Sequence, residues 1–264
     1  MNYKTVTHNF NDFLINIQNL FQKESNKTLF QQRNTLKIVN YEQKEYVVKS
    51  FKIPHLFNQL VYKFFRDSKA QRSYLNSIKL KKLNINTPNP IGYVEFPSLF
   101  LFKESYYISS LIDYDFEIRA VFANEDFKDR ENILEKFIEF SYQLHTKGIY
   151  HIDYSPGNIL IKKVEGQYRF YIIDVNRMKF LKFNNRLRMK NLSKLTKSSK
   201  DNTLMLKYYA KISGLKEEVL LKELTIALKE EEKYLQNKQK LKKLISSISF
   251  YKIKFLRNSK SVSK

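Results

Sequence analysis

The sequence predicts an α+β protein: an antiparallel sheet with helices in the N-terminal part, and mainly helices in the remainder. Short β-branched and aromatic runs between polar turns concentrate before residue 112, whereas apolar residues at helical spacing follow it. With 264 residues and 42% hydrophobic content, the chain can bury one large core or two modest ones. We therefore expect two lobes, over 1–112 and 113–264.

The first lobe is expected to contain a β-hairpin. Strands are predicted over 28–37 and 45–51, because the second run, EYVVKSF, is rich in β-branched and aromatic residues. The polar residues 40–44 supply the turn between these strands. Lys49 therefore lies on a strand of the predicted sheet.

Two helices and two more strands should complete this lobe. Apolar residues recur at helical spacing from His55 to Phe65, and a basic helix is expected from Ser68 to about Lys82. The prolines of NTPNP, at 86–90, stop that helix. The strands are expected over 91–96 and 106–112, on either side of Pro97 and a polar turn at 103–105.

The second lobe should begin with helical structure. Ile133, Phe137, Phe140 and Leu144 share one helical face, and Gly148 is well placed as the C-terminal cap. The following run, NILIKKVEGQYRFYIID, contains two β-rich stretches around Glu-Gly, which indicates a second hairpin. Beyond residue 180 the chain is expected to be helical and strongly basic.

Polar side chains stand at both ends of this second hairpin. Asp153 and Asn158 are five residues apart before its first strand, and Asp174 follows its second strand. Because the two ends of a hairpin are neighbours, Asp174 should return beside Asn158. Carboxylate and amide oxygens suit Mg²⁺, which also accepts phosphate oxygens. The sequence thus predicts a magnesium site at this edge.

The spacing H-x-D-x-x-x-x-N, formed by His151, Asp153 and Asn158, resembles the catalytic loop of the protein-kinase fold. A strand lysine upstream and an aspartate downstream complete the resemblance. It implies that Asp153 orients the acceptor hydroxyl and takes its proton, and that Asn158 and Asp174 hold Mg²⁺ at the phosphates of ATP. Lys49 would neutralise phosphate charge.

A narrower resemblance rests on HIDYSPGNIL and on IIDVNRM, in which Arg177 stands three residues after Asp174. These runs are similar to the bacterial lipopolysaccharide core kinases, as are SKAQRSY and NINTPNPIGYVE, and the similarity spans roughly residues 28–200. It implies ATP-dependent phosphorylation of a heptose or Kdo sugar in the lipopolysaccharide core or a related glycolipid. A hinge near Leu111 would offer backbone groups to adenine.

The chain departs from the kinase pattern in its first lobe. Its first glycine is Gly92, so no Gly-rich loop covers the phosphates, and Arg33 and Asn34 of FQQRNTLK are candidate replacements. Helix 68–82 contains no carboxylate to pair with Lys49, and Ser73 stands where a glutamate is expected. A noncatalytic kinase fold acting as a basic membrane-surface module is therefore an alternative.

Three further residues in or near the candidate motif, Arg177, His151 and Tyr154, are expected to have supporting or alternative roles. Arg177 either contacts phosphate or locks the loop to Asp153, and we group both residues as catalytic candidates. His151 is expected to pack and to bond the backbone. Tyr154 either lines the acceptor pocket or is an ordinary loop residue. Asp174 precedes Val-Asn rather than Phe-Gly, which argues against a regulated signalling kinase, although protein and small alcohols remain alternative acceptors.

The net charge of +22 favours an anionic partner. We expect peripheral contact with the cytoplasmic surface of the inner membrane, where each basic residue contributes about 1 kcal/mol. No specific nucleic-acid motif is present, and AT-rich coding bias is an alternative source of the lysines. The absence of cysteine, of an apolar leader and of any long apolar run makes a cytoplasmic protein the expectation.

Overall fold

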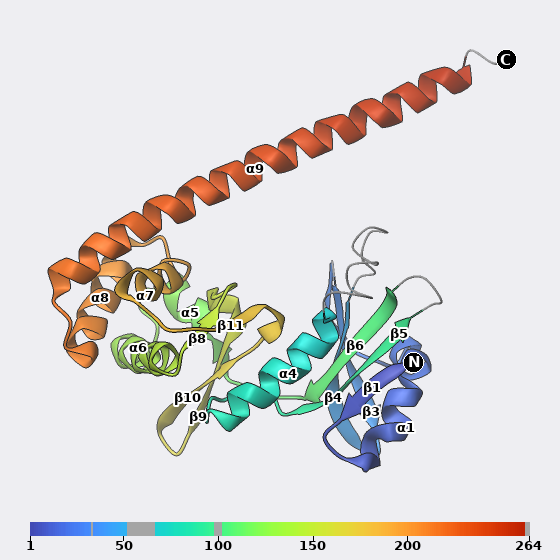
Figure 1. The fold of residues 1–264 in the computed structure, drawn as a ribbon, viewed down its shortest axis with the longest axis horizontal. Helices are drawn as coiled ribbons and strands as arrows, with labels where there is room; N and C mark the ends of the chain where they lie inside the picture. The colour runs from blue at the N-terminus through green and yellow to red at the C-terminus, as the bar shows by residue number, and fades with distance from the viewer. Residues whose placement is uncertain (33, 52–66, 98–101, 262–264) are drawn as a thin grey trace. The chain divides into compact units, whose positions relative to one another are not determined.

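The structure is a computed structural model that describes residues 1–32, 34–51, 67–97 and 102–261. It divides into two compact units, 1–182 and 183–264. Within these ranges the first unit contains the sheets, and the second is helical (Figure 1). This confirms the predicted α+β class. The lobe boundary predicted at residue 112 falls inside the first unit and stays a prediction.

The first unit is built on a six-stranded sheet with the order β1-β5-β6-β4-β3-β2, in which every neighbouring pair is antiparallel. The predicted hairpin is β3 and β4. Glu42 and Gln43 form its turn with φ of 48° and 60°, the backbone that a two-residue hairpin turn requires. The strands are β1 (Asn2–Thr5), β2 (Thr28–Gln31), β3 (Asn34–Tyr41), β4 (Lys44–Phe51), β5 (Pro90–Pro97) and β6 (Phe102–Ser110).

Two strand predictions were wrong. The single strand expected over 28–37 is two antiparallel strands, β2 and β3. The turn expected at 103–105 lies inside β6, which ends at Ser110 rather than Ile112. Polar residues there are compatible with a strand because β5 and β4 supply backbone partners on both sides of Ser105. Polarity alone therefore did not distinguish a turn from a paired strand.

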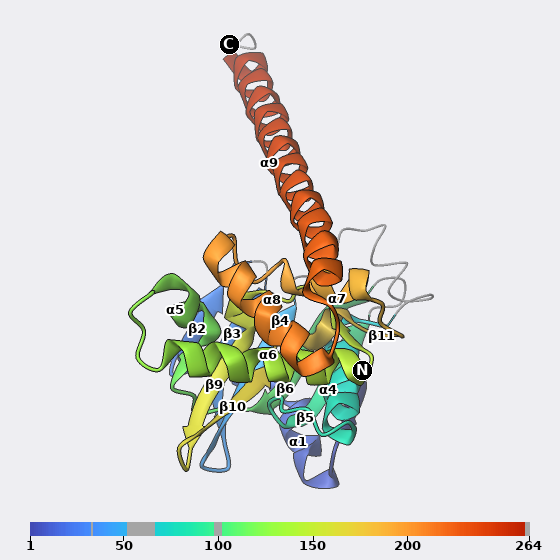
Figure 2. The ribbon, with the colours of Figure 1, turned by 90° about the vertical axis from the view of Figure 1, so that its left-hand side faces the viewer.

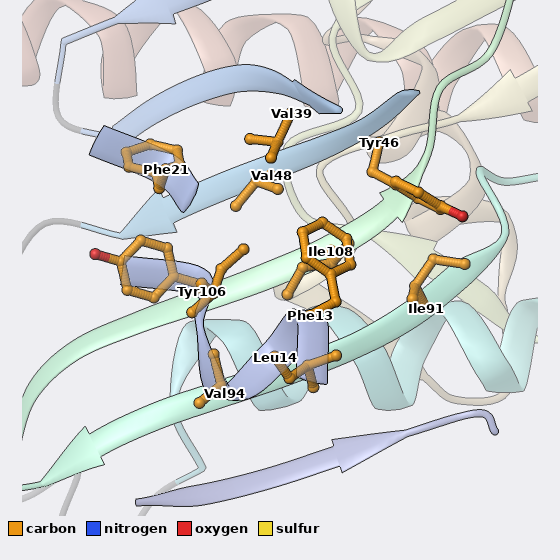
Figure 3. Packing of buried hydrophobic residues seen from close by; sticks show 11 residues of the cluster. Phe13, Leu14, Phe21, Val39, Tyr46, Val48, Ile91, Val94, Tyr106 and Ile108 are labelled. Atoms are coloured by element: carbon orange, nitrogen blue, oxygen red, sulfur yellow. The ribbon is translucent and has the colours of Figure 1, made fainter. Parts of the chain in front are cut away.

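One face of this sheet carries an apolar core. The short helices α1 (Asn11–Ile15) and α2 (Ile17–Gln22) follow the 3₁₀ turn η1 (His8–Phe10) and cover this face. Phe13 and Leu14 of α1 point into the space between Val48, Ile108 and Val94 of the strands (Figure 3). Because side chains alternate along a strand, the residues between these core positions face the other side.

Helix α4 (Lys69–Lys82) packs against that other side, behind the strands in Figure 3. Ser68 caps the helix by accepting a hydrogen bond from Gln71 N at 3.0 Å, so the predicted start is confirmed. Tyr107 of β6 shares a hydrogen bond of 2.8 Å with Ser77. Lys49 is directly opposite Tyr107 in register and shares this face. The helix expected over 55–65 lies outside the described residues.

The rest of the first unit holds the elements around the His151–Asn158 motif. Gly148 adopts a φ of 72° after helix α6, which confirms it as the predicted cap. Strands β9 and β10 run side by side (Figure 2), and Glu165 and Gly166 form the predicted turn with φ of 51° and 79°. The elements are β7 (Phe116–Glu117), α5 (Ile118–Ala123), α6 (Arg130–Thr146), β8 (Ile149–His151), η2 (Pro156–Asn158), β9 (Ile159–Val164), β10 (Gln167–Ile172), η3 (Val175–Arg177) and β11 (Met178–Phe180).

The second unit consists of α7 (Asn185–Leu192), α8 (Ser199–Ser213) and the 45-residue α9 (Glu217–Ser261). Glu230 of α9 pairs with Arg186 at 2.6 Å and with Lys190 at 3.3 Å, which ties α9 to α7. A cavity of about 990 Å³ is lined by residues of α8, α9 and the segment before α8. Among the described residues, no helix is both long and apolar enough to cross a membrane.

Candidate active site

The run from His151 to Asn158, the candidate catalytic motif, forms a compact turn between β8 and β9. Ser155 N donates to Asp153 O at 2.8 Å, and Asn158 Nδ2 donates to the same oxygen at 2.8 Å. Asn158 thus holds the backbone of Asp153 while its own side chain stays at the end of the turn. These two predicted site residues lie together.

Tyr154 anchors this turn to helix α6. Its side chain is 0% exposed and lies against Phe137, with ring centroids 6.1 Å apart. Its hydroxyl shares a hydrogen bond of 2.8 Å with Ser141 Oγ, so the buried polar atom is satisfied. Burial in the core contradicts a place for Tyr154 in the lining of an acceptor pocket. The position of Asp153 is instead fixed from beneath by α6.

The second hairpin returns the chain to this turn. Ile159 at the start of β9 pairs with Ile172 at the end of β10. Directly beyond this pair, Ile173 N donates to Asn158 O at 3.0 Å. The buried His151 forms a hydrogen bond of 3.1 Å between Nε2 and Ile173 O. The structure therefore places Asp174 next to Asn158, and His151 bonds the backbone that connects them.

Asp174 has a left-handed backbone, with φ of 54° and ψ of 47°. Aspartate is among the few residues that adopt this region, at a cost that surrounding contacts must offset. Those contacts converge on one carboxylate oxygen, because Lys49 Nζ lies 2.6 Å and Asn176 Nδ2 lies 2.5 Å from Oδ1. Among the described residues, Oδ2 receives no hydrogen bond. The second oxygen is thus available to a ligand.

The carboxyl group of Asp174 is held in its ionised form. Burial alone would raise its pKa, but the charge and hydrogen bond of Lys49 lower it, as do the charge of His151 and the hydrogen bond of Asn176. The net result is a pKa below the ordinary aspartate value. Asp174 is therefore a carboxylate near neutral pH, which cation binding requires.

Lys49 reaches Asp174 from the sheet. Its side chain is 13% exposed and points to the face of the sheet that carries α4. Ser73 of α4, at the position where a glutamate was expected, instead donates to Lys69 O at 2.8 Å within its own helix. In the described structure Lys49 therefore takes Asp174 as its ion-pair partner.

Arg177 pairs with Asp153. Its Nη1 lies 3.0 Å from both carboxylate oxygens, and both side chains remain partly exposed. This contact joins the turn after Asp174 to the Asp153–Asn158 turn, which is the locking role considered for Arg177. A direct contact between Arg177 and phosphate stays a prediction.

The residues present fit a magnesium ion and nucleotide phosphates. Asp174 Oδ2 and the amide oxygen of Asn158 are hard donors without protein hydrogen bonds among the described residues. No group of three or more His, Asp and Glu side chains suited to a metal occurs in the described part. Such a donor-poor site suits Mg²⁺, which keeps water and phosphate ligands, better than a metal held entirely by protein.

Of the two nucleotide contacts predicted away from Lys49, Asn158 and Asp174, only Leu111 lies among the described residues. Leu111 follows β6, is partly buried, and has no backbone hydrogen bond among the described residues. Its N–H and C=O groups are therefore available to an adenine ring. Arg33, the candidate phosphate ligand of the first lobe, lies outside the described residues.

Sequence reasoning missed two asparagines that support the site. Asn176 donates to Asp174, and Asn76 Nδ2 of α4 donates to Val175 O at 2.7 Å. The spacing of Asn176, two residues after Asp174, was a usable local signal. Asn76 is separated from Val175 by 99 positions and had no signal in the sequence. Together they fix the segment that presents Asp174.

An antiparallel sheet that carries a largely buried lysine, a helix beneath an Asp–Asn turn and a hairpin ending in aspartate define a kinase-like phosphotransferase. A profile of the lipopolysaccharide kinase (Kdo/WaaP) family matches residues 22–214. The chain belongs to this family, and it is a kinase.

Comparison with a solved structure of WaaP supports the fold. WaaP, solved in complex with acyl carrier protein, matches with a TM-score of 0.61 and 15% identity, over 90% of this chain and 99% of that one. The kinase domain of Mycobacterium tuberculosis PknI matches with a TM-score of 0.41 and 12% identity, over 70% of this chain and 72% of that one. No curated protein sequence matches the chain.

Proposed function

We propose that this kinase transfers the γ-phosphoryl group of ATP to a sugar hydroxyl of the lipopolysaccharide core or a related glycolipid. The observation that carries the proposal is the pairing of Lys49 with an ionised Asp174, directly beside the Asp153–Asn158 turn. Membership of the lipopolysaccharide kinase family supports the acceptor class. In this proposal 1–112 and 113–264 act as nucleotide-binding and acceptor-binding lobes.

In the proposed reaction Asp153 accepts the proton of the acceptor hydroxyl. The acceptor oxygen forms a bond to the γ-phosphorus, the bond from that phosphorus to the β–γ bridging oxygen breaks, and ADP leaves. Arg177 orients Asp153 through its ion pair at 3.0 Å. The fixed turn contributes mainly by positioning, because a phosphoryl transition state requires alignment and charge neutralisation more than covalent assistance.

The nucleotide would be held by residues of both parts of the first unit. Asp174 and Asn158 would hold Mg²⁺, which neutralises the charge of the β- and γ-phosphates when bound. Lys49 donates to phosphate oxygens, and Leu111 offers backbone groups to adenine. Arg33 is the proposed further phosphate contact.

Replacement of Asp153 tests the proposal. Asp153→Asn keeps the shape of the side chain but cannot take a proton, so turnover should fall about 100- to 10,000-fold, the range for loss of a general base. Affinity for ATP should be unchanged. Transfer of labelled γ-phosphate to purified core oligosaccharide, beside thermal shifts with ATP and Mg²⁺, measures both quantities.

Two results would contradict the proposal. Wild-type turnover by Asp153→Asn would remove Asp153 from its role. A wild-type protein whose melting temperature does not respond to ATP and Mg²⁺ would instead support the noncatalytic alternative, which the missing carboxylate of α4 favours.

The proposed place of action is the cytoplasmic surface of the inner membrane. Eight basic and no acidic residues occur over 178–200, and ten and none after Glu232. Two of the basic residues in 178–200, Arg186 and Lys190, already form ion pairs with Glu230. The exposed lysines of α9 are therefore the better candidates for contact with anionic lipid.

A further inference from the structure

Besides Lys49 and Arg177, the described residues place a third cationic side chain beside the proposed active site, Arg119 of helix α5. Helix α5 lies against the 3₁₀ turn η2, which carries Gly157 and Asn158. A β-carbon built at position 157 would collide with the Arg119 guanidinium, with Cζ at 2.7 Å. The guanidinium therefore rests directly on the backbone of the catalytic turn. Glycine at 157 is what permits this close approach.

Arg119 differs from the other two cations in its available donors. Lys49 and Arg177 are already paired with Asp174 and Asp153. Arg119 has one weak ion pair, from Nε to Glu117 Oε2 at 3.5 Å, and its side chain is 68% exposed. Among the described residues, neither Nη1 nor Nη2 of Arg119 has a protein acceptor within hydrogen-bond distance. Its planar fork of donors is therefore open to an incoming anion.

We propose that Arg119 recognises the acceptor by binding an anionic group, a carboxylate or a phosphate, of the sugar that approaches Asp153. Arginine suits this role because its fork matches the planar carboxylate and the phosphate with two parallel hydrogen bonds. Arg119 is a specificity-determining residue in this proposal, which rests on the proposed function.

The turn explains why recognition at Arg119 is linked to the reacting atoms. Gly157 lies beside Asn158, whose side chain holds the carbonyl oxygen of Asp153 at 2.8 Å. An anion bound by a guanidinium that rests on this turn is held close to the residue that takes the acceptor proton. Binding energy gained away from the reacting hydroxyl is thereby used to orient it.

Binding and kinetic measurements on Arg119→Gln test the proposal. We expect affinity for core oligosaccharide to fall about 10- to 100-fold, the range for losing charge-assisted hydrogen bonds, and the KM for the acceptor to rise in parallel. The KM for ATP should be unchanged, and Arg119→Lys should recover part of the affinity. Arg169→Gln, at an exposed arginine of β10, is the matched control and should behave as wild type.

Gly157→Ala offers an independent variant that retains the charge. Its new methyl group would displace the flexible end of Arg119, so it should weaken acceptor binding, and adding Arg119→Gln should weaken it little further. Enzymatically dephosphorylated and carboxyl-reduced oligosaccharides distinguish the two anions. The anion that Arg119 binds is the one whose removal abolishes the difference between wild type and Arg119→Gln.

The outcomes separate this proposal from the proposed function. Normal turnover with unchanged acceptor affinity in Arg119→Gln, an equal effect in Arg169→Gln, or an effect on the KM for ATP alone would overturn the role of Arg119 only. Turnover that occurs without any core acceptor would overturn the proposed function. A wild-type protein that does not bind core oligosaccharide would overturn both.

Discussion

The positive φ of Asp174 is the clearest sign of a functional constraint at the scale of single residues. The left-handed backbone directs the carboxylate to Lys49 and Asn176, which both donate to Oδ1. An asparagine or glycine would adopt this backbone as readily, but neither would provide a negative charge. Aspartate therefore supplies both the geometry and the charge that the proposed cation-binding role of Asp174 requires.

The depressed pKa of Asp174 predicts a dependence of stability on pH. Because the folded state favours the ionised form, its contribution to the free energy of unfolding is present above the ordinary aspartate pKa of about 3.9. That contribution is lost as the pH falls through the lower pKa of the folded state. Urea unfolding between about pH 5 and pH 3 should show a steeper loss for wild type than for Asp174→Asn.

A matched control is available for this measurement. Asp126 lies exposed in the loop before α6, and Asp126→Asn should retain the wild-type slope. Identical slopes for wild type and Asp174→Asn would show that Lys49 does not hold Asp174 ionised. Because Asp174 is 35% exposed, solvent screening should keep the effect modest.

At the scale of secondary-structure elements, helix α4 supports the site by a contact other than the lysine–glutamate ion pair of protein kinases. It has no carboxylate for Lys49, yet it contacts the segment after Asp174 through Asn76. The capped start at Ser68 and the contact of Ser77 with Tyr107 fix the helix on the sheet. The helix therefore positions Asp174 through its hydrogen bond to the backbone carbonyl of Val175 instead of positioning Lys49 through an ion pair.

Replacement of Asn76 should separate support of the site from support of the fold. Asn76→Ala loses a hydrogen bond of about 1 kcal/mol, but alanine recovers roughly half of that through its higher helix propensity. Urea stability should therefore change by less than about 1 kcal/mol. We expect the KM for ATP in the presence of Mg²⁺ to rise several-fold, because the segment that carries Asp174 loses its attachment to α4 and Asp174 keeps only its contacts with Lys49 and Asn176.

The exposed position 81 of the same helix provides the control, since Lys81→Ala should leave the KM for ATP unchanged. An unchanged KM in Asn76→Ala would show that α4 does not position Asp174 for the proposed binding of Mg²⁺ and ATP. A large loss of stability would instead assign Asn76 to folding.

At the scale of the whole molecule, the net charge of +22 should direct the protein to anionic surfaces. Cosedimentation with phosphatidylglycerol vesicles should be strong at low salt and fall as ionic strength rises, because salt screens exposed charges. Phosphatidylcholine vesicles should bind little protein. Combined replacement of the exposed Lys233 and Lys240 by Gln should weaken binding by up to about 30-fold, at about 1 kcal/mol per lysine.

Binding to both vesicle types without dependence on salt would contradict this electrostatic account. Equal binding by wild type and the double variant would place the contact elsewhere on the chain. Both outcomes leave the kinase assignment unaffected, because that assignment depends on the family match over residues 22–214, which ends before α9.

The sequence by itself determined the local structure, which means where several helices begin or end and where a hairpin turns. The helix starting at Ser68, the cap at Gly148 and the hairpin around Glu165 follow from capping, turn chemistry and periodicity, which act over a few residues. The neighbourhood of Asn158 and Asp174 also followed, because a hairpin brings its own ends together. At 103–105 pairing with the neighbouring strand makes the segment part of β6, and local polarity wrongly predicted a turn there.

Only the tertiary structure decided which side chains meet across long separations. Lys49 and Asp174 are 125 positions apart, and their ion pair depends on which face of β4 looks toward α4. The contact of Asn76 with Val175, the burial of Tyr154 under Asp153 and the guanidinium of Arg119 on Gly157 depend on packing in the same way. The spacing of apolar and polar residues in the sequence does not predict such contacts, because they arise from the packing of whole elements against one another.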